Sequence, residues 1–294
     1  MSDYLPDVRS IPEISSLERS KASDPRTEGL ILFQTCEYVA RKFPYLRHWL
    51  FMRSGLLCLF VLLSTAAWPQ SISLPGHESL YYNIEWRLIN AGKAKVELQQ
   101  ERSGWRIGLH LESSGLVSKL FRVEDDYSVN TNAGLCAENS VFVAHEGSRQ
   151  RETKITFDGA QHHAAYVERD TAKNTVLLQK ETEIPACVHD VIGALYVLRT
   201  LNLEPGQSST MAVTDGKKSV MAKVEAQGRE DIKTPEGVFH TVRYEAYLFN
   251  DVLFRRSAHL NFWLTDDRRR LPVEVRVRMQ FTIGTITLTL AKHE

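Results

Sequence analysis

The stretch Leu271–Leu290, LPVEVRVRMQFTIGTITLTL, decides the fold class because its side chains alternate in polarity. Apolar residues occupy every second position from Leu271 to Ile283, with charged and other polar residues among those between them. The alternation resumes at Ile286, whose apolar successors alternate with threonines. Successive side chains of a β-strand point to opposite faces of the sheet. The stretch therefore predicts strands with one dry face and one wet face.

The same period-two pattern covers much of the chain after Leu80. It predicts strands over residues 80–88, 93–99, 105–112, 127–131, 140–144, 152–157, 164–168 and 175–179. Turn signals such as Asp158-Gly159 separate neighbouring runs and are typical of hairpins. About twelve antiparallel strands with one apolar face must curl to hide that face. The sequence thus predicts an all-β fold, either a large antiparallel curled sheet or a (half-)barrel of about twelve strands.

One segment breaks the strand pattern and predicts an internal helix near residues 189–202. Asp190 is the expected N-cap, and apolar residues recur from Val191 to Leu201 at helical spacing until Pro205-Gly206. The apolar stripe is wide, so we expect the helix to pack on or inside the sheet. A further short turn of helix is expected at 118–121. Alternation alone leaves a membrane-spanning barrel as a competing interpretation, and the internal helix argues against it.

The N-terminal part reads as a leader placed inside the chain. Met52 and Arg53 precede an apolar run and then small residues up to Ala67, which is the layout of a secretory signal peptide. The alternative is a single membrane anchor over residues 49–68. We therefore interpret 1–51 as a disordered or misassigned upstream extension, 52–67 as a signal peptide and 76–294 as a single β-rich domain. The expected location is exported and periplasmic.

The charge balance limits the possible partners, and the cysteine content bears on the redox state. Lysine plus arginine and aspartate plus glutamate each number 36, so the chain has no net charge and no basic footprint for nucleic acid. Two cysteines follow the leader, Cys136 and Cys187. In an oxidising compartment they could form one disulfide, and the alternative is two separate buried thiols.

Four aromatic residues lie on the apolar faces of the predicted strands. They are Tyr82, Trp86, Trp105 and Tyr127. They are candidates for lining an internal pocket for an apolar molecule, as in barrels whose interior is not filled by side chains. The alternative is that all four fill the core, because a large sheet needs bulky residues.

Charged residues supply three further candidates. Asp267 and Arg270 belong to the run Thr265–Arg270, which could grip an anionic headgroup, or could be a hairpin turn whose aspartate accepts backbone N–H bonds. Arg199, near the end of the predicted helix, could extend to solvent or satisfy a buried carboxylate such as Asp125 or Asp126.

Motifs for catalysis or cofactors are not found in the sequence. It has no His-Glu-x-x-His, no Cys-x-x-Cys, no nucleophile elbow and no phosphate loop. We therefore predict no catalytic residue, no metal and no cofactor.

Several motifs together resemble a known family. They are YNIEW at Tyr82–Trp86 with the turn Asn90–Gly92, HDVIGALYVLR at His189–Arg199, TPEGVF at Thr234–Phe239, and WLTDDRRRLPV at Trp263–Val273. The chain resembles the bacterial exported-protein family catalogued as domain of unknown function 3108, over essentially all of the segment after the leader. The resemblance implies an envelope location and a β-rich domain. It implies no activity, ligand or catalytic residue.

Three functional hypotheses follow. The leading one is a non-enzymatic periplasmic protein that holds an apolar or lipid-like ligand on the concave side of its sheet. The alternative is a structural or assembly factor of the cell envelope that acts on protein partners through an exposed sheet edge or surface patch. The third is a hydrolase of envelope polymers, which would need a cleft with a carboxylate of raised pKa.

Overall fold

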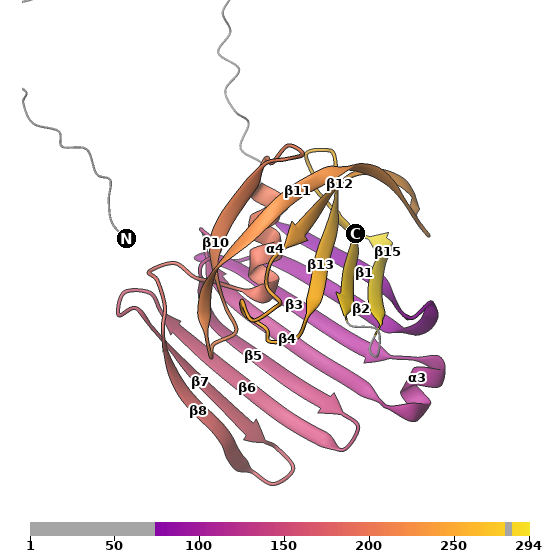
Figure 1. Cartoon of the computed structure of the whole chain (residues 1–294). Helices are drawn as coiled ribbons and strands as arrows, with labels where there is room; N and C mark the ends of the chain where they lie inside the picture. Colours follow the sequence, from indigo (N-terminus) through magenta and orange to yellow (C-terminus); the bar gives the residue numbers. More distant parts are fainter. Residues whose placement is uncertain (1–73, 280–283) are drawn as a thin grey trace, which may run out of the picture. The chain divides into compact units, whose positions relative to one another are not determined.

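The computed structural model describes residues 74–279 and 284–294, and the predicted leader 52–67 and extension 1–51 lie outside them. The described residues form one fifteen-stranded sheet and two helices (Figure 1). The strands are β1 His77–Trp86, β2 Ile89–Gln100, β3 Gly104–Ser113, β4 Val123–Asn132, β5 Ala137–Glu146, β6 Arg149–Asp158, β7 His163–Asp170, β8 Thr175–Glu183, β9 His189–Asp190, β10 Ser208–Thr214, β11 Ser219–Thr234, β12 Gly237–Ala246, β13 Ala258–Thr265, β14 Pro272–Met279 and β15 Thr285–His293. The helices are α3 Gly115–Leu120 and α4 Val191–Thr200.

The sheet consists of two meanders joined along β1 and β15. Strands β1–β8 are paired in chain order and form the first meander, and β10–β15 form the second. The first strand and the last strand then pair antiparallel, so the order runs from β8 through β1 and β15 to β9. The two ends of this order, β8 and β9, are not paired with each other, and the sheet is curled but not closed.

The predicted all-β class with a large curled antiparallel sheet is confirmed, with more strands than the expected twelve. The two-residue strand β9 is too short to show a period of two. The internal helix predicted near 189–202 is α4. The short turn predicted at 118–121 overlaps the slightly earlier helix α3 at residues 118–120.

The stretch Leu271–Leu290 contains β14 and most of β15. Val273 and Leu290 on its dry face are fully buried. On the wet face, the buried Glu274 forms an ion pair with Arg276. The Arg276 guanidinium lies 4.7 Å from the ring centre of Trp263. The long strand β11 reaches β14 and β15 and places Ile232 in the same cluster as Val273 and Leu290.

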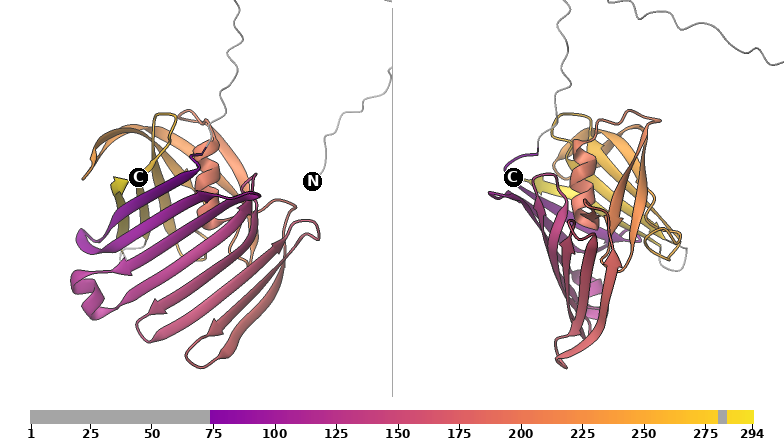
Figure 2. Two further views of the ribbon diagram at one scale, coloured as in Figure 1. Left: turned by 180° about the vertical axis from the view of Figure 1, so that it is seen from behind. Right: turned by 90° about the vertical axis from the view of Figure 1, so that its left-hand side faces the viewer.

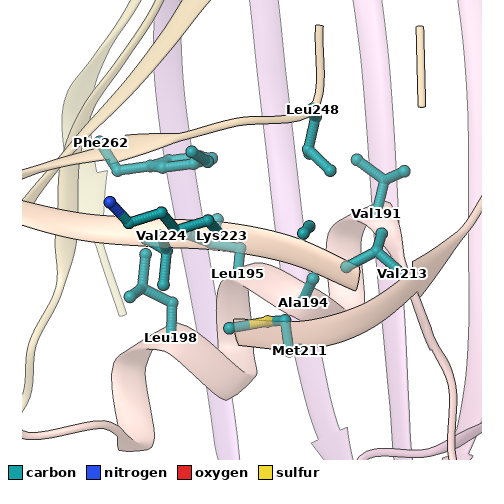
Figure 3. A pocket seen from close by; sticks show the side chains of 12 residues that line it. Val191, Ala194, Leu195, Leu198, Met211, Val213, Lys223, Val224, Leu248 and Phe262 are labelled. Carbon is teal, nitrogen blue, oxygen red and sulfur yellow. The ribbon is translucent and has the colours of Figure 1, made fainter. Parts of the chain in front are cut away.

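Helix α4 lies between the two meanders and fills the space beside the second (Figure 2). Tyr196 packs with the core residues of the first meander, and Leu198 packs with those of the second. Figure 3 shows Leu195 and Leu198 of α4 beside Met211 and Val224, where a residual cavity of about 30 Å³ remains. A space of this size holds about one water molecule, so this region is a packed core.

A buried ion pair fixes the end of α4 to the first strand. Arg199 is 0 % exposed and places NH1 2.5 Å and NH2 2.8 Å from the two carboxylate oxygens of Glu78 in β1. The same NH2 donates to the Arg269 carbonyl at 3.1 Å. The buried carboxylate that pairs with Arg199 is therefore Glu78, and not the suggested Asp125 or Asp126. A buried ion pair is stable only with close, hydrogen-bonded contact. This bidentate geometry satisfies both carboxylate oxygens of Glu78, while Arg199 Nε has no hydrogen-bond partner within the described residues.

The start of α4 is fixed to the turn between β4 and β5. Cys136 and Cys187 form a disulfide that closes a segment of 51 residues. The Ala137 N–H donates to the Val188 carbonyl at 2.8 Å. In the chain-entropy model a loop of this length contributes about 4 kcal/mol to stability.

No helix in the described part of the chain is long and apolar enough to cross a membrane.

Candidate functional site

An open groove lies on the inner face of the first meander, where α4 does not cover it. Its volume is about 550 Å³, within the range of small-molecule sites. Strands β3–β7 form the floor, the start of α4 and the β10–β11 turn form one wall, and Phe254 reaches in from the loop before β13. The lining residues are Leu109, Tyr127, Phe142, Ala144, Glu146, Arg151, Thr153, Ile155, Tyr166, Glu168, Asp190, Val191, Ile192, Thr214, Asp215, Lys217 and Phe254. We call this cavity the groove.

The floor of the groove follows one row of neighbouring residues across the strands. The row runs Leu109, Tyr127, Phe142, Thr153, Glu168 from β3 to β7. The rings of Tyr127 and Phe142 have their centres 6.2 Å apart. Neighbouring strands are about 4.8 Å apart, so this row is about 19 Å long. The floor therefore changes from apolar at β3 to charged at β7.

The charged end of the groove has a connected set of side chains. Arg151 in β6 donates to Glu168 Oε1 at 2.6 Å, and the Tyr166 hydroxyl donates to Glu168 Oε2 at 3.0 Å. Burial is the main cause that raises the pKa of Tyr166 to about 12, so its hydroxyl stays protonated at neutral pH. The Lys217 ammonium lies 5.1 Å from the ring centre of Tyr166.

The β10–β11 turn holds this end together. Gly216 has a φ of +81°, and a Cβ there would lie 2.6 Å from Ile155 Cδ1 in the floor. The turn carbonyls of Lys217 and Gly216 accept hydrogen bonds from the side chains of Lys180 and Thr182 in β8. A turn from the second meander thus contacts the free edge of the first, and glycine permits both the backbone conformation and the close approach.

Asp190 links the wall of the groove to its floor. Its carboxylate accepts hydrogen bonds from the Ile192 and Gly193 N–H groups, as an N-cap does, and from the Tyr127 hydroxyl at 2.8 Å. Burial raises the pKa of Asp190, and these hydrogen bonds oppose that rise. The predicted N-cap is thus present in the structure, and its carboxylate is engaged in holding α4 on β4.

The predicted ligand-binding residues lie in several places, and among them Tyr127 lines the groove. The remaining aromatic residues, Tyr82, Trp86 and Trp105, pack in or against the core clusters. Arg199 is paired with Glu78. Asp267 accepts the backbone N–H groups of Arg269 and Arg270 in a hairpin turn, and Arg270 is buried against Tyr244.

Sequence reasoning missed the groove residues Phe142, Arg151, Glu168 and Lys217. The predicted strands 140–144, 152–157 and 164–168 contain three of them, or border them, and β-alternation assigns them to a face. That pattern does not say which strands the helix leaves uncovered. Lys217 lies in a turn, for which alternation gives no signal.

A second hollow, of about 860 Å³, lies on the wet face of β1, β14 and β15. Its lining includes Thr285, Thr287 and Thr289 together with the ion pair of Glu274 and Arg276. Such a surface is typical of a solvated sheet face. Within residues 74–279 and 284–294, no cluster of three or more histidine, cysteine, aspartate or glutamate residues has the arrangement of a metal site.

The chain is similar to several solved structures. A β-barrel-like protein of the domain of unknown function DUF1849 from Brucella abortus matches with a TM-score of 0.50 and 9 % identity, over 76 % of this chain and 98 % of that one. A DUF1089 family protein from Pseudomonas aeruginosa matches with a TM-score of 0.31 and 15 % identity, over 64 % and 90 %. A Bacteroides fragilis protein described as exported, with a YmcC-like fold, matches with a TM-score of 0.29 and 10 % identity, over 76 % and 98 %.

The first of these likenesses supports a β-barrel-like architecture and carries no functional information at this level of identity. No curated protein sequence matches the chain. The family resemblance seen in the sequence motifs is confirmed by a match that covers residues 81–291. The chain therefore belongs to the family described as Protein of unknown function (DUF3108).

Proposed function

We propose that this protein is a non-enzymatic, exported envelope protein that holds an apolar or lipid-like molecule in the groove. The observation that carries the proposal is the floor row from Leu109 through Phe142, an apolar surface that α4 leaves uncovered beside an open volume of about 550 Å³. An alkyl chain bound on this row would cover apolar surface that otherwise faces water. Each Å² of apolar surface removed from water would favour binding by about 25 cal/mol.

The shape of the site supports an elongated ligand. The floor is apolar at β3–β5 and the walls add Val191, Ile192 and Phe254. Polar residues concentrate at β6, β7 and the β10–β11 turn. A molecule with an apolar chain and a polar end matches this distribution, with the chain toward β3 and the polar end toward β7.

The test uses the full chain and an apolar fluorescent probe, N-phenyl-1-naphthylamine, displaced by dodecanol below its solubility limit. We expect saturable displacement. Thr153→Phe places a ring over the middle of the floor row and should weaken dodecanol binding at least tenfold. Val238→Phe adds the same ring at an exposed position of β12 and should leave binding unchanged. Unsaturable displacement, or equal binding by both variants when both are folded, would overturn the proposal.

The alternative, an assembly factor that pairs with a protein, is favoured by the edge strand β8. Val176, Leu177 and Leu178 follow one another in β8 and are each 39 % exposed or more. An unpaired edge with apolar side chains can accept a strand from a partner. A photo-crosslinking amino acid at position 177 in cells separates the two functions. A crosslinked protein supports the alternative, and absence of a protein adduct contradicts it.

The hydrolase hypothesis receives less support from the groove. Asp190 is a carboxylate of raised pKa in a cleft, as that hypothesis requires. Its two oxygens, however, already accept three hydrogen bonds from α4 and Tyr127. A general acid or base must reach the proton that it transfers. Asp190 is better explained as the group that fixes the wall of the groove.

A further inference from the structure

We infer that the polar end of the groove takes a zwitterionic headgroup, one that carries a phosphate and an ammonium. The inference rests on the proposed function and specifies its ligand class. It is carried by charged side chains of both signs that line the groove and have hydrogen-bonding groups left over.

The cationic part of the site is formed by Lys217 and Arg151. Within the described residues, Lys217 Nζ has no hydrogen bond or ion pair and lies over the Tyr166 ring at 5.1 Å. Arg151 uses NH1 for Glu168 and has a side chain 43 % exposed, which leaves its other N–H groups available. A guanidinium beside an ammonium is a common arrangement for a phosphate oxygen pair.

The carboxylates near these cations are largely engaged. Both oxygens of Glu168 accept hydrogen bonds, from Arg151 and Tyr166. Asp215 Oδ1 accepts the backbone N–H groups of Lys217 and Lys218 at 2.9 Å each. An incoming anion would therefore meet donors with free capacity at this end of the groove.

The anionic part of the site is Glu146 in β5. Its carboxylate lines the groove and forms no hydrogen bond or ion pair within the described part of the chain. Ala144 pairs with Arg151 in the sheet, and Glu146 is two residues further along the same strand, hence on the same face. Diagonal neighbours of this kind are about 7–8 Å apart at Cα, so the side chains of Glu146 and Arg151 project from neighbouring positions on one face of the sheet.

Asp125, on the adjacent strand, adds a second carboxylate to this face, because it pairs with Ala144 in the sheet. Burial, followed by the Glu146 carboxylate, raises the pKa of Asp125. Asp125 accepts one hydrogen bond, from the His145 N–H at 3.1 Å. An ammonium group of a ligand beside Glu146 would relieve this repulsion, while a phosphate beside Lys217 and Arg151 would complete the opposite pair.

The experiment compares five probes on the full chain below their micelle concentrations. They share a chain or a headgroup: dodecanol, dodecyl phosphate, dodecylamine, dodecylphosphocholine and phosphocholine. We expect dodecylphosphocholine to bind at least tenfold more tightly than dodecanol, with dodecyl phosphate and dodecylamine, whose headgroups carry charge of one sign only, between them. Phosphocholine, which lacks the chain, should not bind measurably.

Two variants assign the charges. Lys217→Gln should weaken dodecyl phosphate and dodecylphosphocholine about tenfold and leave dodecylamine unchanged. Glu146→Gln should weaken dodecylamine and dodecylphosphocholine and leave dodecyl phosphate unchanged. Lys233→Gln and Glu138→Gln, at exposed strand positions outside the groove, are the matched controls and should alter no probe.

The outcomes separate the inference from the proposed function. If dodecanol binds and dodecylphosphocholine binds no better, the headgroup inference fails and the proposed function stands. If dodecyl phosphate or dodecylamine binds as tightly as dodecylphosphocholine, the headgroup needs charge of one sign only and the inference fails. If dodecanol does not bind at all, the proposed function fails. If phosphocholine alone binds as well as its dodecyl form, a headgroup site without a chain site replaces both.

Discussion

Helix α4 fills one region of the concave side and leaves another open. Beside β10–β13 the residual cavity is about 30 Å³, whereas over β3–β7 the groove holds about 550 Å³. The helix has ten residues, so it is about 15 Å long and spans at most about three strand spacings. A sheet of fifteen strands therefore exceeds what one such helix can cover. The groove follows from the mismatch between the length of the helix and the width of the sheet.

Two carboxylates, one in each region, also differ in how completely they are paired. In the filled region Glu78 is matched by a bidentate arginine. In the open region Asp125 has a backbone hydrogen bond and a neighbouring carboxylate. A carboxylate whose oxygens are all hydrogen-bonded is typical of a site from which water is excluded. Incomplete pairing is typical of a surface that meets water or a ligand.

Breaking the ion pair of the filled region should have the largest effect. Arg199→Met removes the partner of Glu78 and should lower the free energy of unfolding by about 3–5 kcal/mol, because a charge is left buried alone. Urea denaturation measures this loss. The double variant Glu78→Leu, Arg199→Met should recover much of it, since no charge then remains buried. An equal loss in the double variant would show that packing, and not charge, dominates.

Truncation of one apolar side chain in each region sharpens the comparison. Leu198→Ala should lower the free energy of unfolding by about 2–5 kcal/mol, because Leu198 is fully buried in the filled region. Phe142→Ala in the open floor should lower the free energy of unfolding by about 1–2 kcal/mol, since its side chain is only partly buried. The same variant should abolish probe binding in the groove. Similar stability losses at both positions would contradict an uncovered floor.

Removal of the disulfide tests how firmly the two regions are joined. Replacing Cys136 and Cys187 by serine should lower the free energy of unfolding by about 2–4 kcal/mol. Hydrogen exchange should rise more at the start of α4 than along β10–β13, because the bridge fixes α4 to the β4–β5 turn. Wild-type protein under reducing conditions is the control and should match the double variant. Uniform loss of protection would argue against this local role.

The smallest effect concerns pH. Folding raises the pKa of Asp125, so the folded chain holds its proton more tightly than the unfolded chain does. Stability from this group is present below the ordinary pKa of 3.8 and is lost as pH rises through the raised value. Relative to wild type, Asp125→Asn should therefore gain stability as pH increases from 3.8 upward. Denaturation curves between acidic and neutral pH measure the difference, and a pH-independent difference would contradict it.

The fold class could be predicted from the sequence because the polarity pattern of each strand depends only on the residues of that strand. Alternation at Leu271–Leu290 depends on neighbouring residues alone, and so does the N-cap at Asp190. The site depends on distant segments instead. Phe142 becomes part of a groove, and Trp105 part of a core, according to where α4 ends and how far the β10–β11 turn reaches. Glu78 and Arg199 are 121 residues apart, and no local pattern links them.

The pairing of β1 with β15 has a consequence for how the chain is made. Strand β1 lies in the middle of the sheet, and its second neighbour is the last strand to be synthesised. Until β15 arrives, β1 presents a bare edge that would recruit other strands. The sheet can therefore complete its pairing at β1 only once β15 has been made, and a chain that ends before β15 would be prone to aggregate through the β1 edge. Loss of the final dozen residues should thus be seen in yield before it is seen in ligand binding.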